Sequence, residues 1–477
     1  MKSGSAIEMN KELWRWQACD LAHAIRTRQI SAREAVTSCL DRLQQVNPRI
    51  NAVVDILAEE ALEAADRADH KVTVGEALRP LHGVPVTYKI NMDYAGRPTT
   101  NGIVALKDLI AKSDNPAIAN WRRAGAIAIG RTNVPPFSAR FFTSNALHGR
   151  TLNPWNPRVT PGGSTGGGAA AVATGIGPLA HGSDRAGSVR YPAYACGILG
   201  LRPTIGRIPM YNSTDRAEPS LATQITHTQG PLARSVRDLR VGFETMAAGA
   251  PHDPWWMPGL PTDPMPIRPC RVALFAKNPG GEMDPAIATT LRSAARWLED
   301  AGYRVEEADP PNFEEIARLF FTMIRSEERS TTTGAIDRLG DDELRKARAS
   351  TMAYASELGY DGYIGAFARR AAILRQWLQF LERYPLLLMP VSSLLPVPFD
   401  YDQQGDAAVA RMLTAHHPML AISMLGLPGL AIPTGQTDGV PVGVQLVAAR
   451  FREDICFAAA EVIEARCPPA TPIEPRD

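Results

Sequence analysis

Two serines stand out in this chain because of the residues that surround them. Residues 161–192 read PGGSTGGGAAAVATGIGPLAHGSDRAGSVRYP, with nine glycines and three serines around a small apolar run. Glycine lets the backbone adopt positive φ or approach another group closely. Segments 162–168 and 182–188 would therefore bring the hydroxyls of Ser164 and Ser188 together among exposed backbone N–H groups. Convergent N–H groups stabilise a developing oxyanion, so the pattern indicates an acyl-transfer site.

Lys89 is the third candidate for chemistry. It follows the apolar run HGVPVTY, which predicts a short buried strand that ends at the lysine. Most lysines are solvated, and a lysine is almost never fully buried without a partner. At the mouth of a buried strand, loss of water would lower the pKa of its ammonium group. A neutral lysine acts as a base toward serine, although the residues alone leave Lys89 as one candidate among 51 basic residues.

Composition limits the kinds of function that are open to this chain. Its 477 residues are 45% hydrophobic and 21% charged, with a formal net charge of +1. These values are typical of a globular domain and argue against a nucleic-acid partner, which usually requires a basic face. No apolar run reaches the ~20 residues that span a membrane. The first ten residues also lack the hydrophobic core of a secretion signal, so we expect a cytoplasmic protein.

The cysteines and histidines do not suggest a metal site. The six cysteines are scattered, without a CxxC pair or a histidine at metal-ligand spacing. The sequence contains neither HExxH nor the nucleotide-binding pattern GxxxxGK[ST]. We therefore expect reduced thiols, no metal and no cofactor.

The order of the predicted elements is that of an α/β protein. Residues 31–45 have a helical pattern with Ser31 as the N-cap and Glu34 three residues later, and Asn47–Pro48 is expected to end this helix. Further helical patterns alternate with short apolar runs that predict strands. This alternation predicts an α/β fold with a parallel or mixed sheet. The predicted strands are residues 51–56, 82–88, 126–129, 271–275, 304–307, 385–391, 427–433 and 442–446.

We expect these elements to form a single domain over residues 1–477. No linker, internal repeat or low-complexity tract interrupts the chain. The domain would begin with a helical segment, residues 9–70. Residues 311–383 are helix-rich and charged, which predicts a cap or surface layer on the sheet.

Taken together, the motifs resemble the amidase signature family of Ser–Ser–Lys hydrolases. The resemblance begins with residues 161–192 and HGVPVTYKIN, and extends to AGAIAIGRTNVPPFS, NPWNP, GPLARSVRDL and LGLPGLAIPTG…GVPVGVQLVA. These segments occur in the family's order and cover the chain from about Glu12 to Val462. Ser188 follows Ser164 by 24 residues and Lys89 precedes Ser164 by 75, separations that are similar to those of the family.

The resemblance implies a fold, a mechanism and a set of site residues. The fold would be a large twisted mixed β-sheet covered by helices on both faces. Ser188 would be the nucleophile, Ser164 the bridging serine after a cis peptide bond from Gly163, and Lys89 the base. The oxyanion would be held by the backbone N–H groups of Arg185, Ala186, Gly187 and Ser188. The supporting residues would be Thr165, Ser183, Asp184 and Arg190, with Asp184 and Arg190 paired beneath the turn.

Four positions depart most clearly from the family pattern. Arg185 and Ala186 replace the common Thr-Gly; backbone donors need no particular side chain, and we expect Arg185 to lie on the surface. Ile90 replaces the usual Asp after the lysine, which makes the surroundings of Lys89 more apolar and favours its neutral form. Pro136 replaces a usual Glu.

The resemblance implies a small-molecule substrate that is an amide, an anilide, a carbamate or an ester. It gives little support for the glutamine-dependent tRNA amidotransferase subunit. We expect activity on aryl amides and aryl carbamates over simple primary amides, no nucleic-acid or membrane partner, and a monomer or homodimer. Six hydrophobic residues could form the substrate pocket, although they are equally consistent with the core: Phe137, Phe141, Phe142, Phe320, Phe321 and Met323.

Two alternatives remain open at this point. Residues 162–166 fit GxSxG, the nucleophile elbow of α/β-hydrolases, which would need a preceding strand and a histidine such as His416 or His417. The segment NPWNP precedes it and does not predict a strand. The chain could also be an inactive binding or scaffold protein in which Arg185 blocks the pocket, since a fold alone does not establish an activity.

Overall fold

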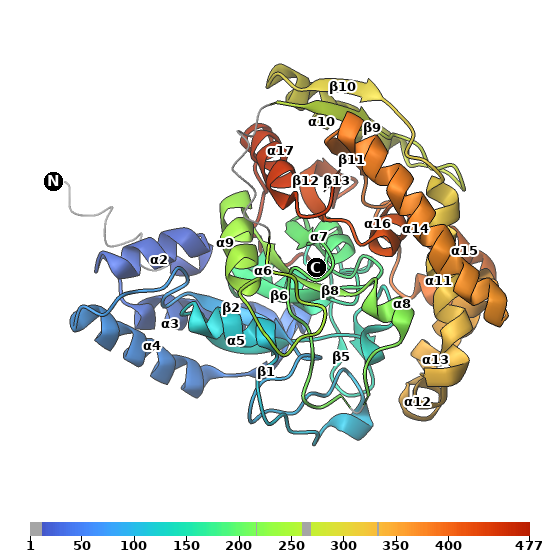
Figure 1. Cartoon of the computed structure of the whole chain (residues 1–477). Helices are drawn as coiled ribbons and strands as arrows, with labels where there is room; N and C mark the ends of the chain where they lie inside the picture. Colours follow the sequence, from blue (N-terminus) through green and yellow to red (C-terminus); the bar gives the residue numbers. More distant parts are fainter. Residues whose placement is uncertain (1–11, 216, 260–268, 332) are drawn as a thin grey trace.

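The centre of the molecule is one large β-sheet. The computed structural model describes residues 12–215, 217–259, 269–331 and 333–477 (Figure 1). Residues 9–11 of the predicted N-terminal helical segment therefore lie outside the described residues. Within the described ranges, an 11-stranded sheet has the spatial order β1 (Val53–Ile56), β3 (Ile127–Thr132), β2 (Pro85–Lys89), β6 (Leu179–Asp184), β8 (Thr228–Ala233), β7 (Leu199–Arg202), β12 (Gly429–Thr437), β13 (Val440–Ala448), β11 (Leu386–Pro390), β9 (Arg271–Leu274) and β10 (Arg304–Glu307).

The sheet is mixed, as the sequence predicts. β3, β2 and β6 run parallel to one another, and so do β11, β9 and β10 near the other edge. The strands between them pair antiparallel. A separate two-stranded ribbon contains β4 (Ser144–Asn145) and β5 (Gly149–Arg150).

The sheet separates two apolar cores. In β11, Leu386 and Leu388 belong to one core, whereas Leu387 and Met389 belong to the other. Successive side chains of a strand point to opposite faces, so each core lies on one face. The expectation of helices on both faces is confirmed.

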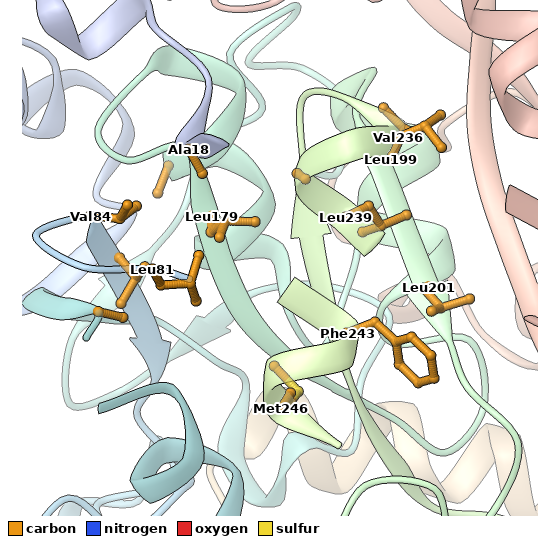
Figure 2. Close-up of a cluster of buried hydrophobic side chains, with 14 of the residues drawn as sticks. Ala18, Leu81, Val84, Leu179, Leu199, Leu201, Val236, Leu239, Phe243 and Met246 are labelled. Carbon is orange, nitrogen blue, oxygen red and sulfur yellow. The ribbon is translucent and has the colours of Figure 1, made fainter. Parts of the chain in front are cut away.

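The first core is covered by helices from both ends of the chain. Figure 2 shows Leu239, Phe243 and Met246 of one helix, α9, among side chains of β6 and β7. This face buries apolar side chains of α2 (Ala18–Arg26), α3 (Ala32–Ile50), α4 (Ala58–Thr73), α5 (Pro116–Arg123), α9 (Val236–Met246), α10 (Pro285–Asp300) and α17 (Glu453–Arg466).

The second core contains most of the helix-rich region 311–383. α11 packs against α16 and α14 (Figure 1). None of the described helices has the length and apolar character needed to cross a membrane. The helices on this side are α7 (Arg190–Cys196), α8 (Leu221–Gln224), α11 (Phe313–Thr331), α12 (Thr333–Leu339), α13 (Asp342–Tyr354), α14 (Tyr360–Arg383), α15 (Asp406–Ala415) and α16 (His417–Leu425).

The start of α3 agrees with the sequence and its end does not. Ser31 Oγ accepts a hydrogen bond from the Glu34 backbone N–H at 3.0 Å, and the Glu34 carboxylate accepts one from Ser31 N–H at 2.7 Å. The prediction that Asn47–Pro48 ends the helix is wrong, because α3 continues to Ile50. A proline this near the end removes only one helical hydrogen bond. Asn47 Oδ1 then accepts the Val53 N–H at 2.9 Å and directs the chain into β1.

Candidate active site

Lys89 meets Ser164 and Ser183 at the ends of two parallel strands. In the pairing of β2 with β6, Thr87 lies opposite Ala180, so both strands end at the same edge. Lys89 is the last residue of β2, and Ser183 is near the end of β6. The Lys89 ammonium donates to Ser164 Oγ at 2.7 Å and to Ser183 Oγ at 3.0 Å.

Small residues allow Ser164 to reach this position. It precedes α6 (Gly166–Thr174), a helix made mostly of glycines and alanines that is buried on every side. The Gly163–Ser164 peptide bond is cis. A Cβ at Gly163 would lie 2.6 Å from the backbone of Phe141 and Phe142, so only glycine fits there. The glycines of this stretch therefore bring segments into contact that larger side chains would hold apart.

The surroundings of Lys89 prepare it to act as a base. Its side chain is fully buried. This burial lowers the pKa of Lys89 from 10.5 to about 7, and the charge of Asp184 only partly opposes the shift. A group with such a pKa is neutral in about half of the molecules at pH 7. Lys89 is thus able to accept a proton from Ser164.

Asp184 organises the turn that carries Ser188. Its carboxylate accepts hydrogen bonds from the backbone N–H groups of Gly187 at 2.9 Å and Val189 at 3.2 Å. It also forms an ion pair with Arg190, with Nη2 and Oδ1 2.9 Å apart. Although burial opposes ionisation, the Arg190 and Arg202 guanidinium groups hold the pKa of Asp184 well below its usual range. The carboxylate therefore stays charged and fixes the turn.

Arg202 belongs to this charged cluster but was not singled out in the sequence. It donates to the Asp184 backbone carbonyl at 2.6 Å and is fully buried. It lies in the segment LGLRPTIG, within the resemblance, yet no local pattern distinguishes it from other arginines. Its role depends on β7 lying two strands from β6, which only the sheet order shows.

The backbone N–H groups predicted to hold the oxyanion are not equivalent. The Gly187 N–H already donates to Asp184 at 2.9 Å, so a substrate would have to compete for it. The backbone N–H groups of Ala186 and Ser188 form no hydrogen bond within the described part of the chain. Thr165 supports the turn from the other side, because its N–H donates to the Ser188 carbonyl at 3.2 Å.

Ser164, Ser183 and Ser188 line the same cavity, which has a volume of about 780 Å³. This lies in the range of small-molecule sites, ~300–1,000 Å³. Ser188 Oγ forms no hydrogen bond with another described residue and faces this cavity. The apolar wall comes from distant parts of the chain and contains Met92, Ile103, Leu106, Leu109, Phe137 and Leu339.

Two predictions about the cavity lining are corrected. Arg185 was expected on the surface, but its half-buried side chain lines the cavity beside Ser188. Of the six hydrophobic pocket candidates, Phe137 lines the cavity. The remaining five belong to the second apolar core: Phe141, Phe142, Phe320, Phe321 and Met323. The last three of these lie on α11, which packs against α16.

The two histidines considered for a nucleophile elbow lie elsewhere. His416 packs on the rings of Phe141 and Tyr191, and His417 Nε2 is 2.7 Å from the Tyr354 hydroxyl. Neither histidine lines the cavity of Ser164. In the described ranges, no group of three or more His, Cys, Asp or Glu side chains is arranged to hold a metal ion.

Further polar residues line the cavity without a signal in the sequence, among them Asn91, Asp215 and His227. Asn91 is only 8% exposed, and its Oδ1 has no hydrogen-bond partner among the described residues. Partial loss of solvent and the nearby Asp93 carboxylate raise the pKa of Asp215 to about 6. These residues come from separate loops, so their proximity is a property of the fold.

Comparison with known proteins places the chain in a family. The family model described as Amidase matches residues 34–457, so this chain belongs to the amidase family. It is an amidase, an enzyme that acts on carbon–nitrogen bonds other than peptide bonds.

The relatives extend over nearly the whole chain. The chain is 44% identical over 455 residues to an indoleacetamide hydrolase of Bradyrhizobium diazoefficiens. The aligned region covers 95% of this chain and 87% of that protein. A solved bacterial aryl acylamidase of the amidase signature family has a TM-score of 0.83 and 26% identity, covering 95% of this chain and 96% of that one. A 6-aminohexanoate cyclic dimer hydrolase bound to substrate has a TM-score of 0.82 and 27% identity, covering 98% and 99%.

Proposed function

We propose that this amidase hydrolyses small aryl amides, anilides and carbamates through a seryl acyl-enzyme. The observation that carries the proposal is the buried Lys89 ammonium, 2.7 Å from Ser164 Oγ, in a site whose cavity also exposes Ser188. Lys89 and Ser164 supply the base and the bridging hydroxyl that a serine nucleophile needs, and Ser188 lines the same cavity as the nucleophile of this proposal. The alternative main activity is hydrolysis of esters through the same acyl-enzyme intermediate.

In the first half-reaction, Ser188 Oγ attacks the carbonyl carbon of the substrate. Its proton passes to Ser164, whose own proton passes to neutral Lys89. The oxyanion accepts hydrogen bonds from the backbone N–H groups of Ala186 and Ser188. The relay then returns one proton through Ser164 to the leaving nitrogen, the carbon–nitrogen bond breaks, and the amine departs.

Water completes the reaction on the acyl-enzyme. Ser164, with Lys89 as the final acceptor, removes a proton from the water as its oxygen bonds to the acyl carbon. The ester bond to Ser188 then breaks and the Ser188 oxygen regains a proton. The sum is one amide and one water converted to one carboxylic acid and one amine.

The choice of aryl substrates rests on the cavity and on the relatives. The wall formed by Met92, Ile103, Leu106 and Phe137 suits an aromatic acyl group. The 44% identical relative is an indoleacetamide hydrolase, and a structural neighbour is an aryl acylamidase. Indoleacetamide is therefore the first amide to test, followed by nitroanilides, aryl carbamates and simple aliphatic amides.

A fluorophosphonate probe tests the mechanism directly. We expect it to label the native protein at Ser188 and not the Ser188→Ala variant, which should also lose turnover of every substrate that the native enzyme accepts. Absence of labelling in the native protein would instead support an inactive scaffold. Turnover of simple aliphatic amides alone would refute the aryl preference and leave the mechanism intact.

A further inference from the structure

Two buried arginines share the single carboxylate of Asp184. Arg190 donates from Nε to Oδ2 at 3.0 Å and from Nη2 to Oδ1 at 2.9 Å. Arg202 donates from Nη1 to the same Oδ1 at 3.3 Å. All three side chains are fully buried, and within the described ranges neither arginine pairs with a second carboxylate. The group therefore buries two positive charges with one negative charge.

The stability of the fold does not account for the second arginine. Arg190 alone gives Asp184 a two-pronged pair, the strong arrangement for a carboxylate. Burial of a further guanidinium costs free energy unless it is fully compensated. Burial and the charges of Arg190 and Arg370 lower the pKa of Arg202 to about 10, although Asp184 opposes the shift. Arg202 Nε also has no hydrogen-bond partner among the described residues. Such a costly charge points to a role in the reaction.

Arg202 differs from Arg190 in that it holds the backbone of Asp184. Its Nη1 donates to the Asp184 carbonyl at 2.6 Å, and its Nη2 donates to the Ser423 carbonyl of α16 at 3.4 Å. β6 ends at Asp184, so the turn that carries Ser188 begins at this carbonyl. Arg202 therefore ties the beginning of the turn to a helix more than 200 residues later in the chain.

The same contact bears on the charge of Lys89. The Asp184 carboxylate favours the ammonium form of Lys89, which cannot accept a proton. A guanidinium bound to Asp184 offsets this charge. The titration of His181 and His227 also responds to Lys89, but burial lowers the pKa of these histidines to about 4 and about 3, so both are neutral. Asp184 and the arginines bound to it are thus the charges that bear on the base.

We propose that Arg202 is a positioning residue of the hydrolysis. It fixes the Asp184 carbonyl at the start of the Ser188 turn and offsets the Asp184 charge that acts on Lys89. Arg202 does not line the active-site cavity, so it acts through Asp184 and not on the substrate. The inference rests on the proposed acyl-enzyme function.

Substitutions at two buried arginines test this role. Arg202→Met removes the charge and the donors, whereas Arg202→Lys keeps the charge. Arg234→Met is the matched control, because Arg234 is also buried but donates to backbone carbonyl groups away from the turn. The measurement is kcat/KM on one anilide from about pH 5 to pH 10. Activity is expressed per active site labelled by the fluorophosphonate, so that a loss of folded protein does not count as a loss of rate.

Arg202→Met should change both the rate and its pH dependence. Above the acidic limb, kcat/KM should fall by about tenfold or more, because a displaced nucleophile costs rate. The limb should move up by about one pH unit, since loss of the cation favours the charged form of Lys89. Arg202→Lys should keep the native limb and regain most of the rate. Arg234→Met should lose stability and keep the native limb and rate.

The outcomes separate this inference from the proposed function. A native limb and a rate within about twofold of native in Arg202→Met, or equal changes in Arg234→Met, would overturn the role of Arg202 and leave the acyl-enzyme mechanism standing. Native protein that resists the fluorophosphonate and cleaves no amide would refute the proposed function itself. Should Arg202→Met fail to fold by circular dichroism, Arg202→Gln is the second test. It keeps an N–H donor without the charge, so its limb should still move up, and a native limb would contradict the role.

Discussion

The hydrogen bond between Lys89 and Ser183 offers a way to retune the base without removing it. Ser183 Oγ lies 3.0 Å from Lys89 Nζ, and both side chains are buried. Ser183→Asp would place a carboxylate beside the ammonium group. Ser183→Asn has nearly the same size without the charge and serves as the matched control.

The size of the effect follows from the pKa of Lys89, which burial lowers to about 7. A carboxylate within ~4–6 Å favours the charged lysine and raises its pKa by about 1–3 units. The neutral fraction at pH 7 would fall from about one half to between about a tenth and a thousandth. The kcat/KM of Ser183→Asp at pH 7 should therefore fall in the same proportion as the neutral fraction of Lys89. It should recover as the pH rises.

The measurement is kcat/KM on one anilide from about pH 5 to pH 10, since this parameter reports the free enzyme. The kcat/KM of the native enzyme and of Ser183→Asn should rise as the pH increases through about 7. The acidic limb of Ser183→Asp should lie at higher pH. Identical limbs for the Asp and Asn variants would show that Lys89 is not the titrating base. A native limb close to the usual pKa of 10.5 would show that burial does not lower the pKa of Lys89.

Two further predictions concern the turn and the stability of the fold. Gly187 has φ of +112°, and a Cβ there would lie 3.0 Å from Met419 Cβ. Gly187→Ala should therefore displace the oxyanion donors and lower kcat by about a hundredfold or more. A near-native kcat in steady-state assays would contradict this prediction. The folded protein releases the Lys89 proton near pH 7 and the unfolded chain near 10.5, so the unfolded state binds more protons between these values. Relative to Lys89→Met, the native free energy of unfolding should therefore rise across this window by at most about 1.4 kcal/mol per pH unit. Urea titrations at several pH values measure the difference, and parallel curves would exclude a buried, neutral Lys89.

Much of the secondary structure follows from local sequence patterns. The capping pair Ser31 and Glu34 begins α3 as predicted, and the strand predicted at residues 304–307 has those bounds. Such features depend on contacts between near neighbours in the chain. Pro48 shows the limit, because α3 continues past this proline to Ile50 although the local pattern predicts that the helix ends there.

The sequence also determined which side chains carry the candidate chemistry, since Lys89, Ser164 and Ser188 stand in recognisable motifs. Only the tertiary structure decided what surrounds them. The Gly187 N–H binds Asp184, Arg185 enters the cavity, and five of the six apolar pocket candidates lie in the core. A residue type and its spacing set local geometry, whereas a cavity wall forms where loops distant in sequence meet. Which atoms face that space depends on the packing of the whole sheet and its helices.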